Sequence, residues 1–346
     1  MFMYQTLDPK SITYQSMPRI SRTILHHLFA TANYARLRGK NRFQLSAKQE
    51  MENSQSAFRK LPDLRQPDMI IALAGWSDAA QVATGTVLYL ARTLDATKFA
   101  QIEGDQFYDF STTRPEVTID RGVINSLQLP HNSLFYWKNR KADRDLVFFH
   151  GIEPHFHWQK FVDTILDSAS NLQVRRIYAL GGLYDNVPHT MEPRISGVVN
   201  KTDLLAVLKK HNIEPINYRG PSSLHGFLLS SCAQRNMEAI SLWGHAPFYV
   251  RVETNPMVCL GLVRKLTELM EIEIDLTELI KAGEYLQDML NRLLADSEEL
   301  QLYIKKLEEQ YEIEGIGPRE PSPGADRIIR EVEDFLRNQR QKGETE

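Results

Sequence analysis

The sequence has few cysteines, no long apolar run and almost no net charge, and each of these shortages argues against a class of protein. The two cysteines, Cys232 and Cys259, each lie in an apolar stretch, which favours small buried side chains over a disulfide framework and fits a reducing cytoplasm. No run of about 18 apolar residues occurs, so we expect no membrane-spanning helix. A formal charge of −3 over 346 residues argues against a dedicated nucleic-acid binder.

The remaining composition is globular, but its charge is unevenly distributed. Hydrophobic residues make up 42% and charged residues 25%, which is enough for a sizeable core. Residues 1–66 hold 11 Lys and Arg against 4 Asp and Glu. This basic stretch has the character of a targeting segment, a weak surface helix or an upstream extension. We expect residues 1–66 to be an N-terminal extension, disordered or not native, and the working protein to begin near Met51.

Between residues 67 and 270, short apolar runs alternate with patterns typical of helices. We predict strands over residues 69–75, 145–150, 176–180, 216–219 and 239–243, and helices over 79–94, 155–169, 202–210, 222–235 and 256–270. The strand at 176–180 is expected to end at Gly181 and Gly182. Three β-prone pieces at 107–110, 116–119 and 133–137 suggest antiparallel strands at a sheet edge. The alternation predicts one α/β domain with three layers and a mostly parallel mixed sheet.

Residues 271–346 form an acidic C-terminal region with helical periodicity, holding 20 Asp and Glu against 10 Lys and Arg. Asp275 and Glu278 are placed like a capping box at a helix start. Apolar residues follow at helical spacing, including Leu286, Leu290 and Leu300. These stripes either pack on the core or mediate oligomerisation and partner binding, and the sequence leaves both interpretations open.

Seven ordered segments together resemble one known family. They are GWSDAA (75–80), YDFSTTRPEV (108–117), GIEPHFHW (151–158), LGGLYDNVPHT (180–190), YRGPSSLHGFL (218–228), SLWGHAPFYV (241–250) and NPMVCLGLVRKL (255–266). The set is similar to the proteasome assembly chaperone family of the subunit-two type and its prokaryotic relatives, with a pattern closest to the bacterial branch. No single segment is specific for this family, but the order and spacing of the seven segments over about residues 65–270 are specific for it.

The resemblance carries several implications for fold and function. It implies a fold similar to purine nucleoside phosphorylases and related hydrolases, and self-association as a trimer or tetramer. It also implies a part in proteasome assembly, as in eukaryotic and archaeal members. Archaeal relatives can end in a hydrophobic-Tyr-any motif that docks into a proteasome ring. This sequence ends in KGETE, which argues against docking of that kind.

Two carboxylates follow directly on predicted strands, at the edge where open α/β sheets bind ligands. Asp78 either binds a ligand hydroxyl or caps the following helix. Glu153 precedes Pro154, a residue suited to the first turn of a helix, and is a candidate for catalysis.

A polar loop after the strand at 176–180 offers the strongest catalytic candidates. His189 is suited to acid–base chemistry, with Glu192 beside it, and Arg194 is suited to holding an anion. The alternative is a loop held by its own hydrogen bonds. Gly220 and Ser222 precede a helix whose free N–H groups attract anions, or they form an ordinary capped turn.

The remaining candidates leave the function open between two classes. Arg114 suits either a salt bridge or an anion contact, and His150, His155 and His157 lack the spacing of a metal site, so we expect no metal and no cofactor. We favour a non-enzymatic assembly chaperone or scaffold in the cytoplasm, a homo-oligomer with a protein partner and without nucleic acid or membrane. The alternative is a small-molecule-binding protein or enzyme at the sheet's carboxyl edge, cleaving nucleosides or ligating carboxylates to amines.

Overall fold

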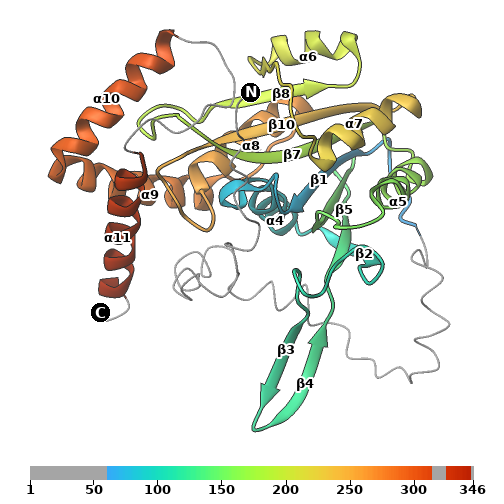
Figure 1. The fold of residues 1–346 in the computed structure, drawn as a ribbon. Coiled ribbons are helices and arrows are strands. Elements are labelled where there is room, and N and C mark those ends of the chain that lie inside the picture. The colour runs from blue at the N-terminus through green and yellow to red at the C-terminus, as the bar shows by residue number, and fades with distance from the viewer. Residues whose placement is uncertain (1–60, 314–324, 344–346) are drawn as a thin grey trace, which may run out of the picture.

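The structure is a computed structural model that describes residues 61–313 and 325–343, and its centre is an eight-stranded sheet (Figure 1). Four central strands are parallel: β6 (Leu146–Ile152), β1 (Asp68–Ala74), β7 (Arg176–Asp185) and β10 (Glu238–Pro247). Antiparallel β5 (His131–Trp137) and β8 (Ile195–Val199) flank them, and β2 (Thr97–Glu103) and β9 (Glu214–Pro215) form the outer edges. The predicted mostly parallel mixed sheet is confirmed.

Helices cover both faces of this sheet, which explains why β1 is apolar at every position along its middle. Met69 and Ile71 face α5 (Trp158–Asn171) and α7 (Leu224–Gln234). Ile70 and Ala72 face α4 (Val82–Thr93) and α8 (Pro256–Met270). Because successive strand residues alternate between faces, a strand buried on both faces needs a continuous apolar run. The three-layer architecture is therefore confirmed.

Shorter elements complete the α4 and α8 side of the domain. A turn of 3-10 helix, η3 (Ala79–Gln81), precedes α4, and η4 (Thr202–Leu204) precedes α6 (Leu205–Lys210). Asn255 caps α8, because its Oδ1 accepts the N–H groups of Met257 (3.1 Å) and Val258 (3.2 Å).

Both cysteines are buried and free, as expected. Cys232 lies in α7 and Cys259 lies in α8.

The predicted end of one strand is wrong for a reason that lies in the packing. Strand β7 does not end at Gly181 and Gly182 but continues to Asp185, because β10 pairs with it along its whole length. A Cβ at Gly181 would lie 2.6 Å from the Trp243 ring, and one at Gly182 would lie 2.8 Å from the Ala79 carbonyl. These glycines make room for neighbours and do not form a turn.

Other boundaries differ from the expectation. The strand expected over 216–219 is replaced by β9 just before it, and residues 107–110 form turns. The predictions also lacked β2, β4 and β8. The piece at 116–119 is not at the edge of the main sheet. It forms β3 (Glu116–Asp120), which pairs with β4 (Val123–Gln128) in a separate hairpin that projects from the body (Figure 1).

The acidic C-terminal region folds onto the domain as helices α9 (Thr277–Asp296), α10 (Glu298–Ile313) and α11 (Ala325–Gly343). Their apolar stripes join the core on the α4 and α8 side and are buried at Leu286, Leu290, Leu300, Ile304, Leu307, Ile328, Val332 and Leu336. The interpretation that these stripes pack on the core is confirmed for the described residues. No capping box forms, since α9 begins at Thr277 and Asp275 accepts its N–H at 2.9 Å.

Residues 1–60, including Met51, lie outside the described residues, whereas residues 61–66 are part of the body. Leu61 and Leu64 pack against the α5 and α7 side of the core. Arg65 donates to the Asp145 carboxylate from its backbone N–H (2.8 Å) and its guanidinium (3.1 Å). No helix of the described chain is both long and apolar enough to cross a bilayer.

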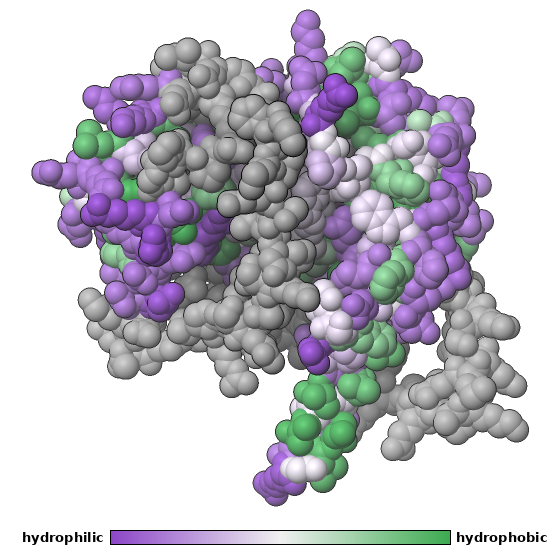
Figure 2. Space-filling view, in the orientation of Figure 1, coloured by the Kyte–Doolittle hydropathy of each residue, from purple (hydrophilic) through white to green (hydrophobic). Residues whose placement is uncertain are grey.

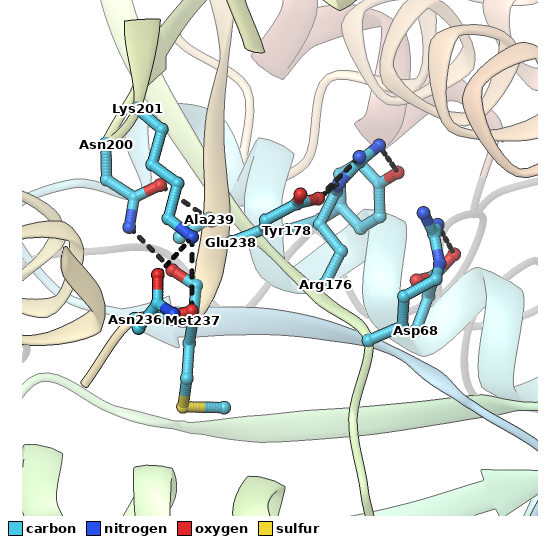
Figure 3. A network of polar contacts seen from close by, with 10 residues as sticks. Asp68, Arg176, Tyr178, Asn200, Lys201, Asn236, Met237, Glu238 and Ala239 are labelled. Carbon is cyan, nitrogen blue, oxygen red and sulfur yellow. Dashed lines mark hydrogen bonds and ion pairs between the residues drawn. The ribbon is translucent and has the colours of Figure 1, made fainter. Parts of the chain in front are cut away.

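Charged pairs lie at the amino-terminal ends of the central strands (Figure 3). Arg176 of β7 donates twice to Glu238 of β10 (2.9 and 2.6 Å), and these two residues are also partners in the strand register. The buried Asp68 of β1 accepts from Arg175 at 2.6 Å. Since hydrogen-bonded pairs of this kind are made in one register only, they define how the parallel strands align.

Candidate functional site at the carboxyl edge of the sheet

Asp78 is a helix cap. It follows β1 in a loop that is held against β7 by the hydrogen bond from the Gly182 N–H to the Ser77 carbonyl (2.7 Å). Its Oδ1 accepts the N–H groups of Ala83 (2.8 Å) and Thr84 (3.1 Å), and its Oδ2 accepts the Thr84 hydroxyl at 2.5 Å. Burial raises the pKa of this carboxyl to about 6, although these hydrogen bonds oppose the rise. Every polar contact described for the Asp78 carboxylate is with the start of α4.

Glu153 joins two loops at the same edge. Its Oε2 accepts the Trp76 N–H (3.2 Å) and its Oε1 accepts the Leu224 N–H (3.0 Å), in the first turn of α7. The close approach of Glu153 to the loop after β1 requires a glycine at position 75. Gly75 has a φ of +141°, and a Cβ at this position would lie 3.0 Å from the Cβ of Glu153. The anion that the helix N-terminus attracts is thus this carboxylate of the same chain.

The turn before α7 is folded on itself. Ser222 is exposed and its hydroxyl donates to the Ser223 carbonyl (2.9 Å). Gly220 is exposed too and lies beside the ring of Tyr218, whose hydroxyl donates to the Pro221 carbonyl (3.0 Å). Ser223 occupies the cap position without a hydrogen bond from its own side chain, and Glu153 supplies the acceptor instead.

His189 lies beneath the C-terminal helices. It is buried, its N–H donates to the Tyr249 hydroxyl (2.7 Å), and its Nδ1 lies 2.6 Å from the same oxygen. Burial lowers the pKa of this imidazole to about 4, against the opposing effects of Asn291 of α9 and Glu308 of α10. The neighbouring Thr190 donates its hydroxyl to Glu308. The side chain is therefore neutral at pH 7 and is enclosed by the acidic C-terminal region.

Three of the predicted residues meet at one small cavity. His189, Glu192 and Arg194 line it together with His245, below Leu290 of α9. Glu192 is exposed and Arg194 is half-buried. Asp78 and Glu153 lie in the neighbouring loops after β1 and β6, and Arg114 is exposed at the base of the β3–β4 hairpin. The structure therefore distributes the candidates over three places. Among the described residues, no group of three His, Cys, Asp or Glu is arranged to hold a metal ion.

A Ser-His-Asp relay, which sequence analysis missed, lies at the ends of β7, β8 and β10. His245 Nδ1 lies 2.8 Å from Asp185 Oδ2, and its Nε2 lies 2.8 Å from Ser196 Oγ. All three side chains are buried. Burial alone would raise the pKa of Asp185, but the hydrogen bond and charge of His245, with the Asn186 N–H and Arg194, hold it below its ordinary value.

Two of the three relay residues lie in segments that the sequence alone singled out. Asp185 and His245 lie in two of the segments that carry the family resemblance, whereas Ser196 belongs to the unpredicted strand β8. The order of contacts is that of a nucleophile, a base and an orienting carboxylate. Without β8, however, nothing in the sequence placed Ser196 beside His245.

Comparisons with a family model and with solved structures point to the same protein family. The family model described as the PAC2 family matches residues 72–294. A PAC2 family protein from Streptomyces avermitilis is 34% identical over 68% of this chain and 99% of that one, with a TM-score of 0.63. A proteasome-assembly chaperone homologue from Mycobacterium tuberculosis is 27% identical over 68% and 99%, with a TM-score of 0.64. No curated protein matches the chain.

A third structure is similar in fold alone. Pyrococcus furiosus PbaB, an archaeal proteasome activator, is 24% identical over 68% of this chain and 96% of that one, with a TM-score of 0.54.

Proposed function

Because the chain belongs to the PAC2 family, we propose that it acts as a non-enzymatic assembly chaperone or scaffold that binds other protein chains. The Mycobacterium tuberculosis relative is described as a proteasome-assembly chaperone homologue, which supports an assembly role of this kind. The proposal places the protein in the cytoplasm, as a trimer or tetramer of identical chains with at least one protein partner.

One observation carries the proposal: two candidate carboxylates, Asp78 for ligand binding and Glu153 for catalysis, bind backbone N–H groups of their own chain. Asp78 caps α4 and Glu153 caps α7. A ligand at either carboxylate would have to displace these bonds, and a lost helix cap costs about 1 kcal/mol. His189 is enclosed below α9 and α10. The polar groups of this edge thus stabilise the fold, which favours binding through the surface of the molecule.

The test is affinity purification of the full-length chain from its native source, with an epitope tag and mild salt. We expect a second protein in reproducible stoichiometric amount, identified by mass spectrometry, and several copies of the chain by native mass spectrometry. A variant with Glu192→Gln, at an exposed candidate residue, should capture the same partner. A lone monomer without a partner would contradict the proposal. A thermal shift with nucleosides, sugar phosphates or nucleotides would instead favour the small-molecule alternative.

A second function, hydrolysis or acyl transfer, is favoured by the Ser196–His245–Asp185 relay alone. In that reaction the Ser196 Oγ would attack a carbonyl carbon and pass its proton to His245 Nε2. The bond from that carbon to the leaving group would break as the leaving group takes this proton, and water or an acceptor would then remove the acyl group from Ser196. Ser196 is fully buried, so the reaction needs an opening of the fold. Labelling by a fluorophosphonate probe, abolished by Ser196→Ala and by His245→Ala, would establish this function. Unlabelled wild-type protein would leave the relay as a structural network.

A further inference from the structure

A groove of about 780 Å³ lies where β5 ends and β2 and β6 begin. The loop after β5 and the ends of α4 and α8 line it. Its volume is within the range of about 300 to 1,000 Å³ that is typical of sites for small molecules. Leu94, Trp137 and Ile272 in its lining are half-buried and pack against the α4 and α8 side of the core. The groove therefore presents apolar surface that is still partly open to solvent.

The charged side chains of this groove are separated by sign. Its three cations all follow β5, and its three anions all follow α4 or α8. These six residues are Lys138, Arg140, Lys141, Asp95, Glu271 and Glu273. Since the charges balance, the groove does not favour a polyanion such as a nucleotide. A ligand with one charge of each sign, by contrast, meets an opposite charge at both of its ends.

Two of the anions lie at helix ends where the fold itself favours other residues. Asp95 (φ +51°) and Glu271 (φ +54°) adopt the left-handed conformation where α4 and α8 end. This position favours glycine or asparagine, and Asn212 and Asn236 occupy it after α6 and α7. A carboxylate there also adds negative charge to the negative end of the helix dipole. Both acidic residues are therefore unfavourable for the helix ends, which points to a role in binding a positive group.

The basic side of the groove is held rigid by buried residues of its loop. The Asn139 N–H donates to the Asp145 carboxylate (2.9 Å), and the Asn139 Oδ1 accepts the N–H groups of Lys141 (2.9 Å) and Ala142 (3.2 Å). Arg65 donates to both the Asn139 carbonyl and the Asp145 carboxylate. Because this backbone is already ordered, a ligand that binds the basic side chains does not have to order the loop.

Most of the charged side chains in the groove are available to a ligand. Lys141 and Glu273 form an exposed ion pair at 3.4 Å, of a kind that contributes little to stability. The other four charged side chains are exposed, and within residues 61–313 and 325–343 they have no hydrogen-bond or ion-pair partner. A ligand with matching charges therefore displaces at most one weak ion pair.

We propose that this groove binds a short peptide with free ends. The peptide carboxylate binds Arg140, whose guanidinium can donate two parallel hydrogen bonds to it. The peptide ammonium binds Asp95 and Glu271 beside the ends of the two helices. The apolar side chains of the peptide cover the half-buried apolar lining of the groove. Two extended residues separate the charged ends by about 7 Å, whereas a single amino acid carries both charges on one carbon.

Isothermal titration calorimetry of the full-length chain with leucyl-leucine tests this site. Two blocked forms are the comparison: N-acetyl-leucyl-leucine lacks the ammonium, and leucyl-leucinamide lacks the carboxylate. We expect leucyl-leucine to bind about tenfold more tightly than either blocked form, because each of them loses a charge-assisted hydrogen bond.

Two substitutions assign the two ends of the ligand. Asp95→Asn should weaken leucyl-leucine and leucyl-leucinamide about tenfold and leave N-acetyl-leucyl-leucine within about twofold. Arg140→Gln should weaken leucyl-leucine and N-acetyl-leucyl-leucine about tenfold and leave leucyl-leucinamide within about twofold. Because asparagine suits the left-handed position, Asp95→Asn should keep or raise the melting temperature, so that its weaker binding does not come from misfolding. Asp288→Asn, at an exposed carboxylate of α9, is the matched control and should leave all three affinities unchanged.

Several results would overturn the inference. They are an absence of heat with leucyl-leucine at millimolar concentration, equal affinities for the free and blocked forms, and equal losses in Asp95→Asn and Asp288→Asn. The site does not depend on the proposed assembly function, which partner capture tests separately. A chain that binds leucyl-leucine with the expected pattern but captures no protein would support this site and contradict the assembly function.

Discussion

Replacing Asp78 by Asn should stabilise the protein at neutral pH and remove one part of its pH dependence. The Asn Oδ1 can still accept the N–H groups of Ala83 and Thr84, and its amide can donate to the Thr84 hydroxyl. The variant therefore keeps the cap of α4 but carries no charge that must be buried. Asp78→Ala also removes the charge but loses the cap, so it should be about 1 to 2 kcal/mol less stable than Asp78→Asn at any pH.

The size of the effect follows from the pKa of the carboxyl. Its pKa is about 6 in the folded state and 3.8 for an ordinary aspartate. A group with a raised folded-state pKa stabilises the protein fully below about pH 3.8, and this stabilisation is lost as the pH rises through about 6. The full difference corresponds to at most about 3 kcal/mol. The advantage of Asp78→Asn over wild type should therefore grow between pH 4 and 6.5 and then stay constant.

The assay is urea unfolding of wild type and variant at half-unit intervals from pH 4 to pH 8. Only the difference between the two curves is interpreted, because other groups titrate in the same range and cancel in the difference. Glu192→Gln, at an exposed carboxylate, is the matched control for the loss of one carboxylate. If Asp78→Asn is less stable than wild type at pH 8, or its difference curve is flat, the carboxylate is not buried at a net cost and the reasoning is refuted.

Three further substitutions and one control substitution test the packing and the caps by urea unfolding. Glu153→Ala should cost about 1 to 2 kcal/mol because the N–H groups of Trp76 and Leu224 lose their acceptor, and an unchanged stability would contradict its capping role. Gly181→Ala should cost about 1 to 3 kcal/mol because its Cβ meets the Trp243 ring, and a neutral result would show that the ring has room to move. Leu290→Ala should cost about 2 to 4 kcal/mol, whereas Leu302→Ala, at an exposed position, should stay within about 0.5 kcal/mol. Equal effects of the two leucine variants would mean that α9 does not pack on the domain.

The layers of the fold could be predicted because they follow from local patterns. The apolar run at 69–75 and the helical spacing after it lie within one short stretch of sequence, and Asn255 with Pro256 marks the start of α8 directly. Periodicity also defined the apolar stripes of the C-terminal helices, and burial of those stripes is the simplest outcome for a helix with one apolar side.

The predictions that failed concern residues whose main contacts are with distant parts of the sequence. Gly181 and Gly182 suggested a turn, but their small size serves Trp243 and Ala79, which are far away in the sequence. Strand β8 is short and its central Gly197 fits against Leu208 and Ile213, so its own pattern is weak. The Ser196–His245–Asp185 relay was missed with it. The site residues predicted from strand ends were correctly placed near the carboxyl edge, but their partners were not predictable.

The polar groups at the carboxyl edge are already bound within the chain, whereas apolar side chains are exposed on the surface. This contrast explains why the surface, and not the carboxyl edge, is the better place to look for binding. At the N-terminus of α7 the favourable interaction with an anion is already made by Glu153, so an added anion must compete with a tethered carboxylate. At the β3–β4 hairpin, whose hydrophobic surface stands clear of the body (Figure 2), no such competition exists, because Ile119 and Ile124 are largely exposed and any apolar partner that covers them gains the burial in full. A chain whose carboxylates at the carboxyl edge already bind its own backbone, and whose apolar side chains are exposed elsewhere, binds most strongly where apolar area remains to be buried.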